Sequence, residues 1–487
     1  MPAKYVIHTK PAAGRLRPVG KLGIVDWRED CSACHNCVKR GCVYGFYRDE
    51  ADTLRDEVGY LDYIYQCKGC LNCVQDCTKN ILTRVVNPEF KRLGDSYYTP
   101  EIILSTWFQA ETGRIPVSGS GYGGPFSGAG FDSMWTDMSE IVRPTRDGIH
   151  GREYISTSVD VGRKLPCLAF RDGQLAVTPP PLLEIPMPVI FDVVPGHWRR
   201  GPVLEAIAGA ASELGTLAVV PAGDADGLWG ETSQGHILPL LDTENPNPAH
   251  RASRDGFHRA DRAGMLPADV CLKAPLVMVP DRADVMTVQP RLKTRNPNQI
   301  VAIRLPATPL AAARVLELTQ QGAEVVHLVF DAHGHETGTA APRHMLDVLR
   351  EVHTSLVKAG LRDEITLIAS GGIALAEHMA KAIICGADLV AIDIPLVVAL
   401  ECRLCRECEK ENPCPIALEE IGRDLAVHRI VNLMGAWHSQ LLEVLGAMGI
   451  REVRRLRGET GRCMFFEDLE RETFGKLFGK RKKEVRS

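Results

Sequence analysis

Short runs of apolar, mostly β-branched residues recur through the second half of the chain, and a more polar stretch follows each run. Most of the runs are continuous rather than alternating, which is typical of parallel strands buried on both faces. They predict eight strands, at Pro188–Val194, Leu217–Pro221, Ile237–Leu241, Val270–Val279, Ile300–Leu305, Val325–Phe330, Ile365–Ser370 and Leu389–Ile394. Helical periodicity lies between several of them, as in Leu310–Gln321 and Ala374–Cys385. Eight such units predict a TIM (β/α)8 barrel, with an open doubly wound sheet as the alternative.

The same pattern divides the chain into regions. The predicted regions are a ferredoxin-like α+β domain at 1–95, a glycine- and proline-rich connecting segment at 96–185, the barrel at 186–425, and closing helices with a basic tail at 426–487. Gly119, Gly121 and Gly124 have the spacing of a dinucleotide-binding loop. Because Pro125 follows where such a loop needs a helix, the three glycines predict an ordinary loop.

Composition and charge limit the function. The chain has 487 residues, 24% of them charged, and a formal net charge of −4, so no overall basic field predicts nucleic-acid binding. The longest apolar run, Leu389–Leu400, is interrupted by Asp393 and Pro395 and is shorter than the roughly 18 residues of a membrane span. The first residues lack the pattern of a signal peptide, so a cytoplasmic protein is expected.

Cysteine is the most informative residue type. Twelve of the sixteen cysteines form three clusters, and two of these clusters begin with Cys-x-x-Cys-x-x-Cys. Three thiolates at this spacing can bind three irons of a cubane, and in two-cluster proteins the fourth ligand comes from the other run. We therefore expect one [4Fe–4S] cluster on Cys31, Cys34, Cys37 and Cys77, and a second on Cys67, Cys70, Cys73 and Cys42. Residues 22–90 resemble bacterial two-cluster ferredoxins; a pair of zinc sites is the alternative.

The third cluster lies far downstream and follows the last predicted strand. It consists of Cys402, Cys405, Cys408 and Cys414, with Pro415 after it. Four thiolates within thirteen residues can bind a [4Fe–4S] cluster, a [3Fe–4S] cluster with a spare thiol, or zinc; iron and sulfide are favoured.

Two predicted strands end in residues typical of binding sites. In a barrel, ligands bind at the carboxyl ends of the strands. The seventh strand ends in Ser370-Gly371-Gly372-Ile373, where two glycines allow the backbone to approach an anion; an ordinary tight turn is equally consistent. The sixth is followed by a segment from Asp331 to Gly338 that holds two histidines and two carboxylates. These side chains predict the lining of a cofactor pocket, with a metal site as the alternative.

The downstream half resembles the FMN-binding synthase domain of glutamate synthases, especially the short archaeal-type proteins with ferredoxin modules. The residues that carry the resemblance are Val301–Leu305, His333–Gly338, the Gly371-Gly372 turn, Pro395–Cys414, and Arg429, Val431 and Asn432 of the helix predicted at His428–Leu445. The resemblance implies FMN in a TIM barrel with an iron–sulfur cluster beside it. It also implies cofactor contacts at Gly371, Gly372, Ile373, Arg304, Lys273, Ala391 and Ile392, and catalytic roles for Lys273, Arg304 and His333.

The chain also departs from that family. No cysteine follows Met1 as the glutaminase nucleophile, and Val194–Arg200 replaces the family's turn after the first strand. The leading hypothesis is an oxidoreductase acting on CH–NH2 donors that passes electrons from the ferredoxin-type clusters through the third cluster to FMN, and so to an imine or carbonyl substrate such as that from 2-oxoglutarate. The alternatives are an electron-transfer subunit of a larger complex, without 2-oxoglutarate binding, and a structural scaffold. An electron-donor protein or partner redox subunit is expected, within a complex or homo-oligomer.

Overall fold

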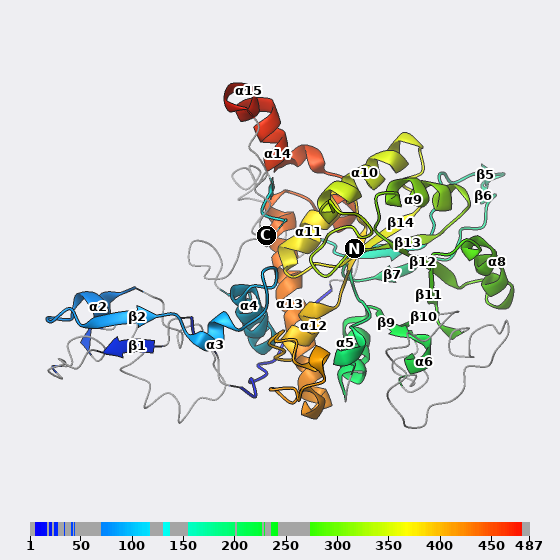
Figure 1. The fold of residues 1–487 in the computed structure, drawn as a ribbon. Helices are drawn as coiled ribbons and strands as arrows, with labels where there is room; N and C mark the ends of the chain where they lie inside the picture. The colour runs from blue at the N-terminus through cyan, green and yellow to red at the C-terminus, as the bar shows by residue number, and fades with distance from the viewer. Residues whose placement is uncertain are drawn as a thin grey trace.

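A computed structural model gives the fold shown in Figure 1. The structure describes residues 5–16, 19–21, 24–27, 34, 40–41, 43, 70–116, 130–136, 154–199, 202–225, 228, 235–241 and 273–479. Eight parallel strands close into a barrel in the order in which they occur along the chain, which confirms the predicted TIM barrel and excludes the open sheet. They are β8 (Val189–Phe191), β9 (Ala218–Pro221), β10 (Ile237–Leu240), β11 (Leu276–Pro280), β12 (Ile300–Pro306), β13 (Val325–Val329), β14 (Thr366–Ser370) and β15 (Leu389–Ile392).

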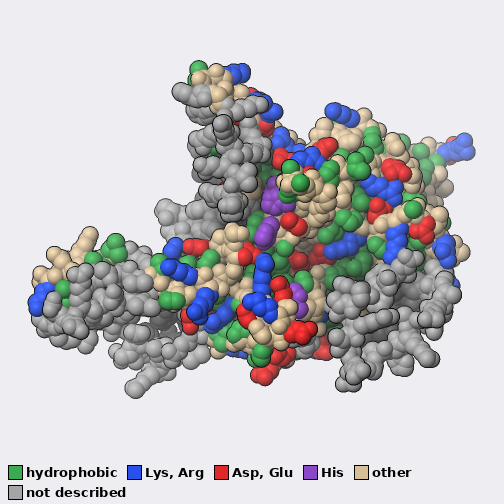
Figure 2. All heavy atoms as spheres, in the orientation of Figure 1, with side chains coloured by type: hydrophobic (Ala, Val, Ile, Leu, Met, Phe, Trp, Pro, Cys, Tyr) green, Lys and Arg blue, Asp and Glu red, His purple; other side chains and the backbone are tan. Residues whose placement is uncertain are grey.

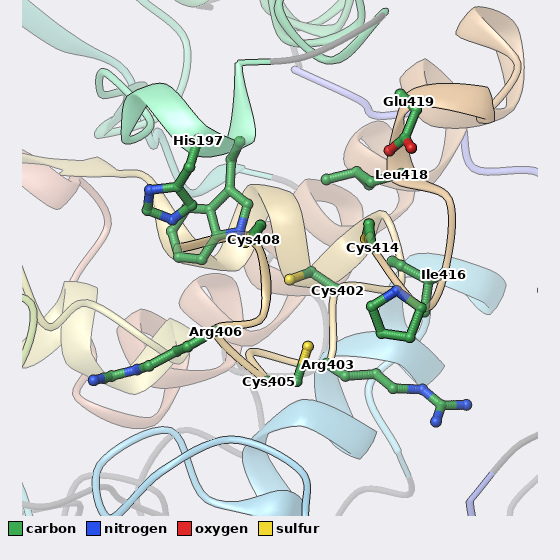
Figure 3. Close-up of a pocket in the computed structure, with 12 residues that line it drawn as sticks. His197, Cys402, Arg403, Cys405, Arg406, Cys408, Cys414, Ile416, Leu418 and Glu419 are labelled. Atoms are coloured by element: carbon green, nitrogen blue, oxygen red, sulfur yellow. The ribbon is translucent and has the colours of Figure 1, made fainter. Parts of the chain in front are cut away.

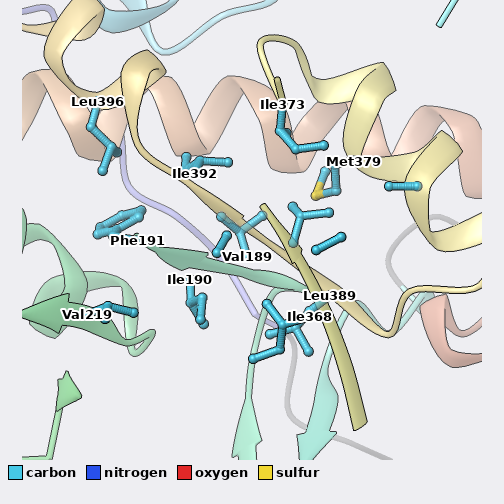
Figure 4. Close-up of a cluster of buried hydrophobic side chains, with 14 of the residues drawn as sticks. Val189, Ile190, Phe191, Val219, Ile368, Ile373, Met379, Leu389, Ile392 and Leu396 are labelled. Atoms are coloured by element: carbon cyan, nitrogen blue, oxygen red, sulfur yellow. The ribbon is translucent and has the colours of Figure 1, made fainter. Parts of the chain in front are cut away.

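All eight strands overlap the segments that the apolar runs predicted, because continuous apolar residues suit a sheet covered on both faces. The main helices of the barrel region are α5 (Val203–Leu214), α8 (Val285–Arg295), α9 (Ala311–Gln320), α10 (Met345–Lys358), α11 (Ala376–Ile384) and α13 (Arg423–Ala447). Figure 4 shows the apolar side chains of β8 and β15, including Ile190, Phe191 and Leu389, gathered in the core.

The apolar run at Leu389–Leu400 divides into two elements. β15 ends at Ile392, and α12 (Ile394–Ala399) begins directly after it. Asp393 separates them because its side chain caps the helix, accepting a hydrogen bond from the backbone N–H of Ile394 at 2.6 Å. Pro395 lies in the first helical turn, where its missing N–H costs nothing. The eighth strand is therefore two residues shorter than the predicted strand Leu389–Ile394.

The region predicted to be a glycine-rich connection contains a helix that the sequence analysis missed. α4 (Pro100–Thr112) begins with a proline in its first turn and ends at Gly113, which adopts a left-handed conformation with φ of 67°. It packs against α12 and α13 with eight buried residues, so it belongs to the core of the barrel domain. Gly119, Gly121 and Gly124 lie outside the described residues.

A small module stands beside the barrel in Figure 1. β1 (Ile24–Trp27) and β2 (Leu82–Val85) pair antiparallel, and α2 (Asn72–Gln75) lies between them in sequence. The short helix α3 (Pro88–Lys91) leads from β2 toward α4. The pairing of β1 with β2 brings together the two ends of the segment that carries the first two cysteine runs.

The surface is mixed in charge. Figure 2 shows Lys and Arg side chains interspersed with Asp and Glu over the visible face, in keeping with the net charge of −4. Within the described part of the chain, none of the helices combines the length and the apolar character needed to cross a membrane.

Candidate functional site

The carboxyl end of the barrel carries a buried polar network. Arg304 on β12 and His327 on β13 are paired in register, and Asp192 and Ser370 lie at the ends of β8 and β14. Since the carboxyl ends of parallel barrel strands meet at one mouth, residues distant in sequence come together there. His327, Asp192 and Ser370 are all buried.

Arg304 and Asp192 form the charged part of this network. The Arg304 guanidinium donates two hydrogen bonds to the Asp192 carboxylate, at 2.6 and 3.1 Å. Burial alone would raise the pKa of Asp192, but Arg304 and then His327 outweigh it and lower that pKa to about 2. The carboxylate is therefore ionised, and the bidentate pair holds the guanidinium in one orientation across the mouth.

His327 connects Arg304 to Ser370 through hydrogen bonds. Burial lowers the pKa of His327 to about 3, so the ring is neutral. Its Nδ1 lies 3.3 Å from an Arg304 nitrogen, which can only donate, so Nδ1 accepts and Nε2 carries the proton. Nε2 then donates to Ser370 Oγ at 2.8 Å. The Ser370 hydroxyl keeps its own proton to donate to a group bound in the mouth.

An open cavity of about 290 Å³ lies above this network. Its lining includes Asp192, Arg304, Ser370, Gly371 and Asp393 from the barrel, and Asp95 and Tyr98 from the segment before α4. The volume is near the lower end of the range of about 300–1,000 Å³ typical of small-molecule sites.

Two of the lining side chains, Tyr98 and Asp393, are polar groups in unfavourable surroundings. The Tyr98 hydroxyl is buried, and among the described residues it has no hydrogen-bond partner. Burial, and then repulsion from Asp192, raises the pKa of Asp393 to about 6. A buried hydroxyl without a partner costs free energy, so the mouth is suited to a polar ligand that supplies one.

The turn after β14 fits a phosphate group. Gly371 and Gly372 have φ of 96° and 69°, and a Cβ on Gly371 would lie 2.6 Å from the carbonyl oxygen of Phe330. Only glycine suits this close approach. Gly371, Gly372 and Ile373 are buried residues, and no hydrogen bond from their successive backbone N–H groups to another described residue is found. Backbone N–H groups in a buried turn need acceptors, so the turn is suited to an anion such as a phosphate group.

The third cysteine cluster surrounds a second hollow, beside the mouth. Cys402, Cys405, Cys408 and Cys414 all line it. In Figure 3 the sulfurs of Cys402, Cys405 and Cys414 face a common space, while the guanidinium groups of Arg403 and Arg406 point away. In the described part of the chain, no set of three or more His, Cys, Asp or Glu side chains is arranged to hold a single metal ion. Thiols spread around a hollow fit a polynuclear iron–sulfur cluster better than one zinc ion.

The backbone around these thiols is unusual. Glu401, Leu404, Arg406, Glu411 and Ala417 all have positive φ, between 44° and 74°, although none is glycine. Such conformations cost free energy and persist only where the surroundings impose them. The loop is thus held in a shape that turns the thiols inward, as a ligand set for a cluster requires.

The two hollows share a wall. His197, Trp198 and Arg406 line both the cysteine hollow and the mouth cavity. Arg406 donates to Asp95 at 2.8 Å, and the Gly94 N–H donates to the Arg403 carbonyl at 3.0 Å. The segment that leads out of the N-terminal module is therefore fixed directly to the loop of the third cysteine cluster.

The structure brings some of the predicted site residues to the mouth and not others. Arg304 and Gly371 line the cavity, whereas Gly372 and Ile373 lie buried in the adjoining turn. Lys273 is exposed and precedes β11, so it lies at the opposite end of the barrel from the mouth. Ala391 and Ile392 are fully buried core residues of β15.

His333 closes one side of the mouth. Its ring stacks on Tyr97 with a centroid separation of 5.2 Å, and its Nε2 lies 3.3 Å from Asp95. The Tyr97 hydroxyl in turn donates to the Gly372 carbonyl. His333 therefore anchors the segment before α4 against the glycine turn, and it is not among the residues that line the cavity.

The cysteines predicted to bind the N-terminal clusters are described in part. Cys70 is exposed and precedes α2, Cys73 is buried within it, Cys77 is half-buried and follows it, and Cys34 is exposed. The side-chain amide of Asn72, on α2, donates to the Gly41 carbonyl at 2.5 Å. This contact places α2 next to Gly41, and the predicted exchange of ligands between the two cysteine runs stays a prediction. Cys31, Cys37, Cys42 and Cys67 lie outside the described residues.

Sequence reasoning missed Asp192, His327, Asp393, Tyr98 and Trp198. For three of them a signal was present: His327 interrupts an otherwise apolar strand, and Asp192 and Asp393 each directly follow one. A polar residue at such a place points toward the barrel mouth. Tyr98 and Trp198 come from loops, and the sequence carried no comparable signal for them.

Comparisons with known proteins show that the chain is similar in sequence to glutamate synthases. Residues 274–451 match the family model described as a conserved region in glutamate synthase. The chain is 25% identical to an archaeal glutamate synthase [NADPH] of Archaeoglobus fulgidus, across 93% of this chain and 96% of that protein. It is 26% identical to an archaeal-type glutamate synthase [NADPH] of Dehalococcoides mccartyi, across 89% and 93%.

Solved structures also show similarity. A lactate oxidase from Pediococcus acidilactici covers 64% of this chain and 84% of its own length, with a TM-score of 0.35 and 12% identity. A mandelate oxidase variant with benzaldehyde covers 66% and 98%, with a TM-score of 0.36 and 14% identity. Similarity this low adds nothing to the barrel topology already described.

Proposed function

We propose that this chain is a glutamate synthase-like oxidoreductase that delivers electrons through the third cysteine cluster to a flavin and a substrate at the barrel mouth. The observation that carries the proposal is the wall shared by the cysteine hollow and the mouth cavity, formed by His197, Trp198 and Arg406. The similarity to archaeal-type glutamate synthases across nine-tenths of the chain supports it.

The residues of the mouth have distinct tasks in this proposal. The N–H groups of the Gly371-Gly372 turn hold the FMN phosphate, and the Ser370 hydroxyl, fixed through His327, donates a hydrogen bond to the bound group. Arg304 places positive charge at the floor of the mouth, where it favours an anionic ligand. When bound, FMN supplies the ability to accept single electrons and to transfer a hydride to an imine or carbonyl carbon.

The cysteines supply the ligands for the electron path. Cys402, Cys405, Cys408 and Cys414 hold the third cluster, as [4Fe–4S] if all four thiolates bind. The N-terminal module holds two [4Fe–4S] clusters and receives electrons from an external donor protein or a partner redox subunit. The bond from Gly94 to the Arg403 carbonyl supports this order, because it attaches the module to the loop of the third cluster.

A second function, electron transfer without 2-oxoglutarate binding, is favoured by the charges of the mouth. A dicarboxylate substrate needs cations, but the two arginines of the cavity are each paired with an aspartate, Arg304 with Asp192 and Arg406 with Asp95. Asp393 and Glu409 add further acidic groups to the lining. In this second function, the chain transfers its electrons to a partner protein or to a substrate with fewer negative charges than a dicarboxylate.

One assay separates the two functions. Anaerobically purified protein is given reduced viologen, 2-oxoglutarate and ammonia, and glutamate is measured by chromatography. The leading proposal predicts glutamate from the wild-type protein and none from Cys402→Ser. If the wild-type flavin is reduced but no glutamate forms, the second function is supported. If the protein binds neither flavin nor iron, both functions are excluded.

A further inference from the structure

The wall between the two hollows contains a buried hydrogen-bond donor without an acceptor. Trp198 ends the 3-10 turn η6 (Gly196–Trp198), directly after β8, and only 6% of the residue is exposed. Its indole Nε1 is buried and has no hydrogen-bond partner among the described residues. A buried N–H that lacks a partner costs about 1–3 kcal/mol, so it points to an acceptor that a bound group supplies.

The neighbours of Trp198 indicate which group that is. η6 packs against the 3-10 turn η8 (Cys408–Lys410), which begins at one of the four cysteines. The adjoining His197 reinforces this contact: its ring lies 4.4 Å from the Trp198 ring, and its Nε2 lies 3.9 Å from Glu409 on η8. Trp198 itself lines the cysteine hollow. The turn that carries the indole is thus fixed to the turn that carries Cys408.

We infer that Trp198 donates its indole N–H to a sulfur of the cluster held by Cys402, Cys405, Cys408 and Cys414, and thereby raises the reduction potential of that cluster. The inference rests on the proposed function and assigns Trp198 a tuning role within it. Reduction adds negative charge to the cluster, and a donor directed at sulfur stabilises the reduced form. The hydrogen bond therefore favours uptake of electrons by the third cluster from the N-terminal module.

The position of Trp198 makes this effect specific to one cluster. The indole also lines the mouth cavity, so it occupies the wall through which the cluster and the flavin face each other. α2, which carries Cys73 of the predicted N-terminal ligands, lies in the small module beside the barrel (Figure 1). A change at Trp198 is therefore expected to alter the reduction potential of the third cluster only.

Substitution by phenylalanine tests the inference, because it removes the N–H and keeps an aromatic ring. Full-length Trp198→Phe is titrated anaerobically and followed by EPR, with Trp107→Phe as the matched control. Trp107 is also buried, and its Nε1 has no hydrogen-bond partner within the described part of the chain, but it lines neither hollow. The reduction potential of one iron–sulfur cluster is expected to become more negative in Trp198→Phe and to stay unchanged in Trp107→Phe. Unchanged cluster couples in Trp198→Phe, or a shift of the flavin couple alone, would overturn the inference.

A second measurement needs no substitution. Wild-type protein with 15N in the tryptophan indole is reduced and studied by pulsed EPR, and a nitrogen coupling to one reduced cluster is expected. Absence of that coupling contradicts the inference even if Trp198→Phe fails to assemble.

Iron analysis of Cys402→Ser separates this result from a failure of the proposed function. If the wild type holds the iron and sulfide of only two clusters and Cys402→Ser holds as much, the third cluster is absent and both proposals fail. If it loses the iron of one cluster while the Trp198 tests are negative, only the role of Trp198 fails.

Discussion

At the scale of single residues, the barrel mouth depends on one buried ion pair. Asp192 and Arg304 come from strands 112 residues apart, and the Asp192 side chain is only 4% exposed. The Asp192 carboxylate is buried and the Arg304 side chain is 19% exposed, so removing the carboxylate leaves a largely buried guanidinium without its partner. The pair thus sets both the stability of the mouth and the orientation of His327 and Ser370.

Asp192→Asn is therefore expected to lower the free energy of unfolding by about 3–5 kcal/mol, the usual cost of breaking a buried pair. Urea denaturation followed by circular dichroism measures the change. Glu452→Gln is the control, because it breaks the exposed pair of Glu452 with Arg455 and should cost no more than about 1 kcal/mol. Equal effects in the two variants would show that Asp192 is not a buried partner of Arg304.

At the scale of elements, two contacts hold helices and segments in place around the barrel. The Glu377 side chain on α11 accepts a hydrogen bond from Gln440 on α13 at 2.5 Å. Burial raises the pKa of Glu377 to about 7, outweighing the attraction of Lys381. The carboxyl is thus protonated in the folded protein at pH values where it is ionised in the unfolded chain.

The sign of the resulting pH dependence follows from linkage. Between the ordinary pKa of 4.5 and about 7, the folded state binds more protons at Glu377 than the unfolded state does, so its contribution to stability falls as the pH rises. Glu377→Gln removes this dependence. The difference in unfolding free energy between variant and wild type should grow in favour of the variant from pH 5 to pH 8. A constant difference would mean that the Glu377 pKa is not raised.

The second contact attaches the N-terminal module to the loop of the third cluster. Gly94 has φ of 68°, and its N–H donates to the Arg403 carbonyl; a Cβ there would collide with the Tyr98 carbonyl. Gly94→Ala is expected to destabilise the protein by more than about 1 kcal/mol, because alanine does not fit this conformation. Thermal unfolding and iron content after gel filtration measure the effect. Gly223→Ala, with open space around the added methyl group, is the control, and an equally mild effect at Gly94 would argue against this attachment.

At the scale of the whole molecule, more of the architecture than of the candidate site could be predicted from the sequence. The eight barrel strands could be predicted because most are continuous apolar runs. α4 could have been predicted from Pro100 at its start and Gly113 at its end, but the abundance of glycine and proline around it suggested loop. The polar network at the mouth could not be predicted from the sequence, because Arg304, Asp192 and His327 come together only when the barrel closes.

The central claim is that electrons reach the barrel mouth through the cysteine hollow. It is tested most directly by mixing anaerobic protein with a reduced ferredoxin as the only electron donor and following the flavin absorbance by stopped flow. The account predicts that wild-type protein and Cys402→Ser both retain FMN, and that the flavin is bleached rapidly in the wild type and far more slowly in the variant. Equal rates of bleaching in the two proteins, or wild-type protein without FMN, would contradict the account.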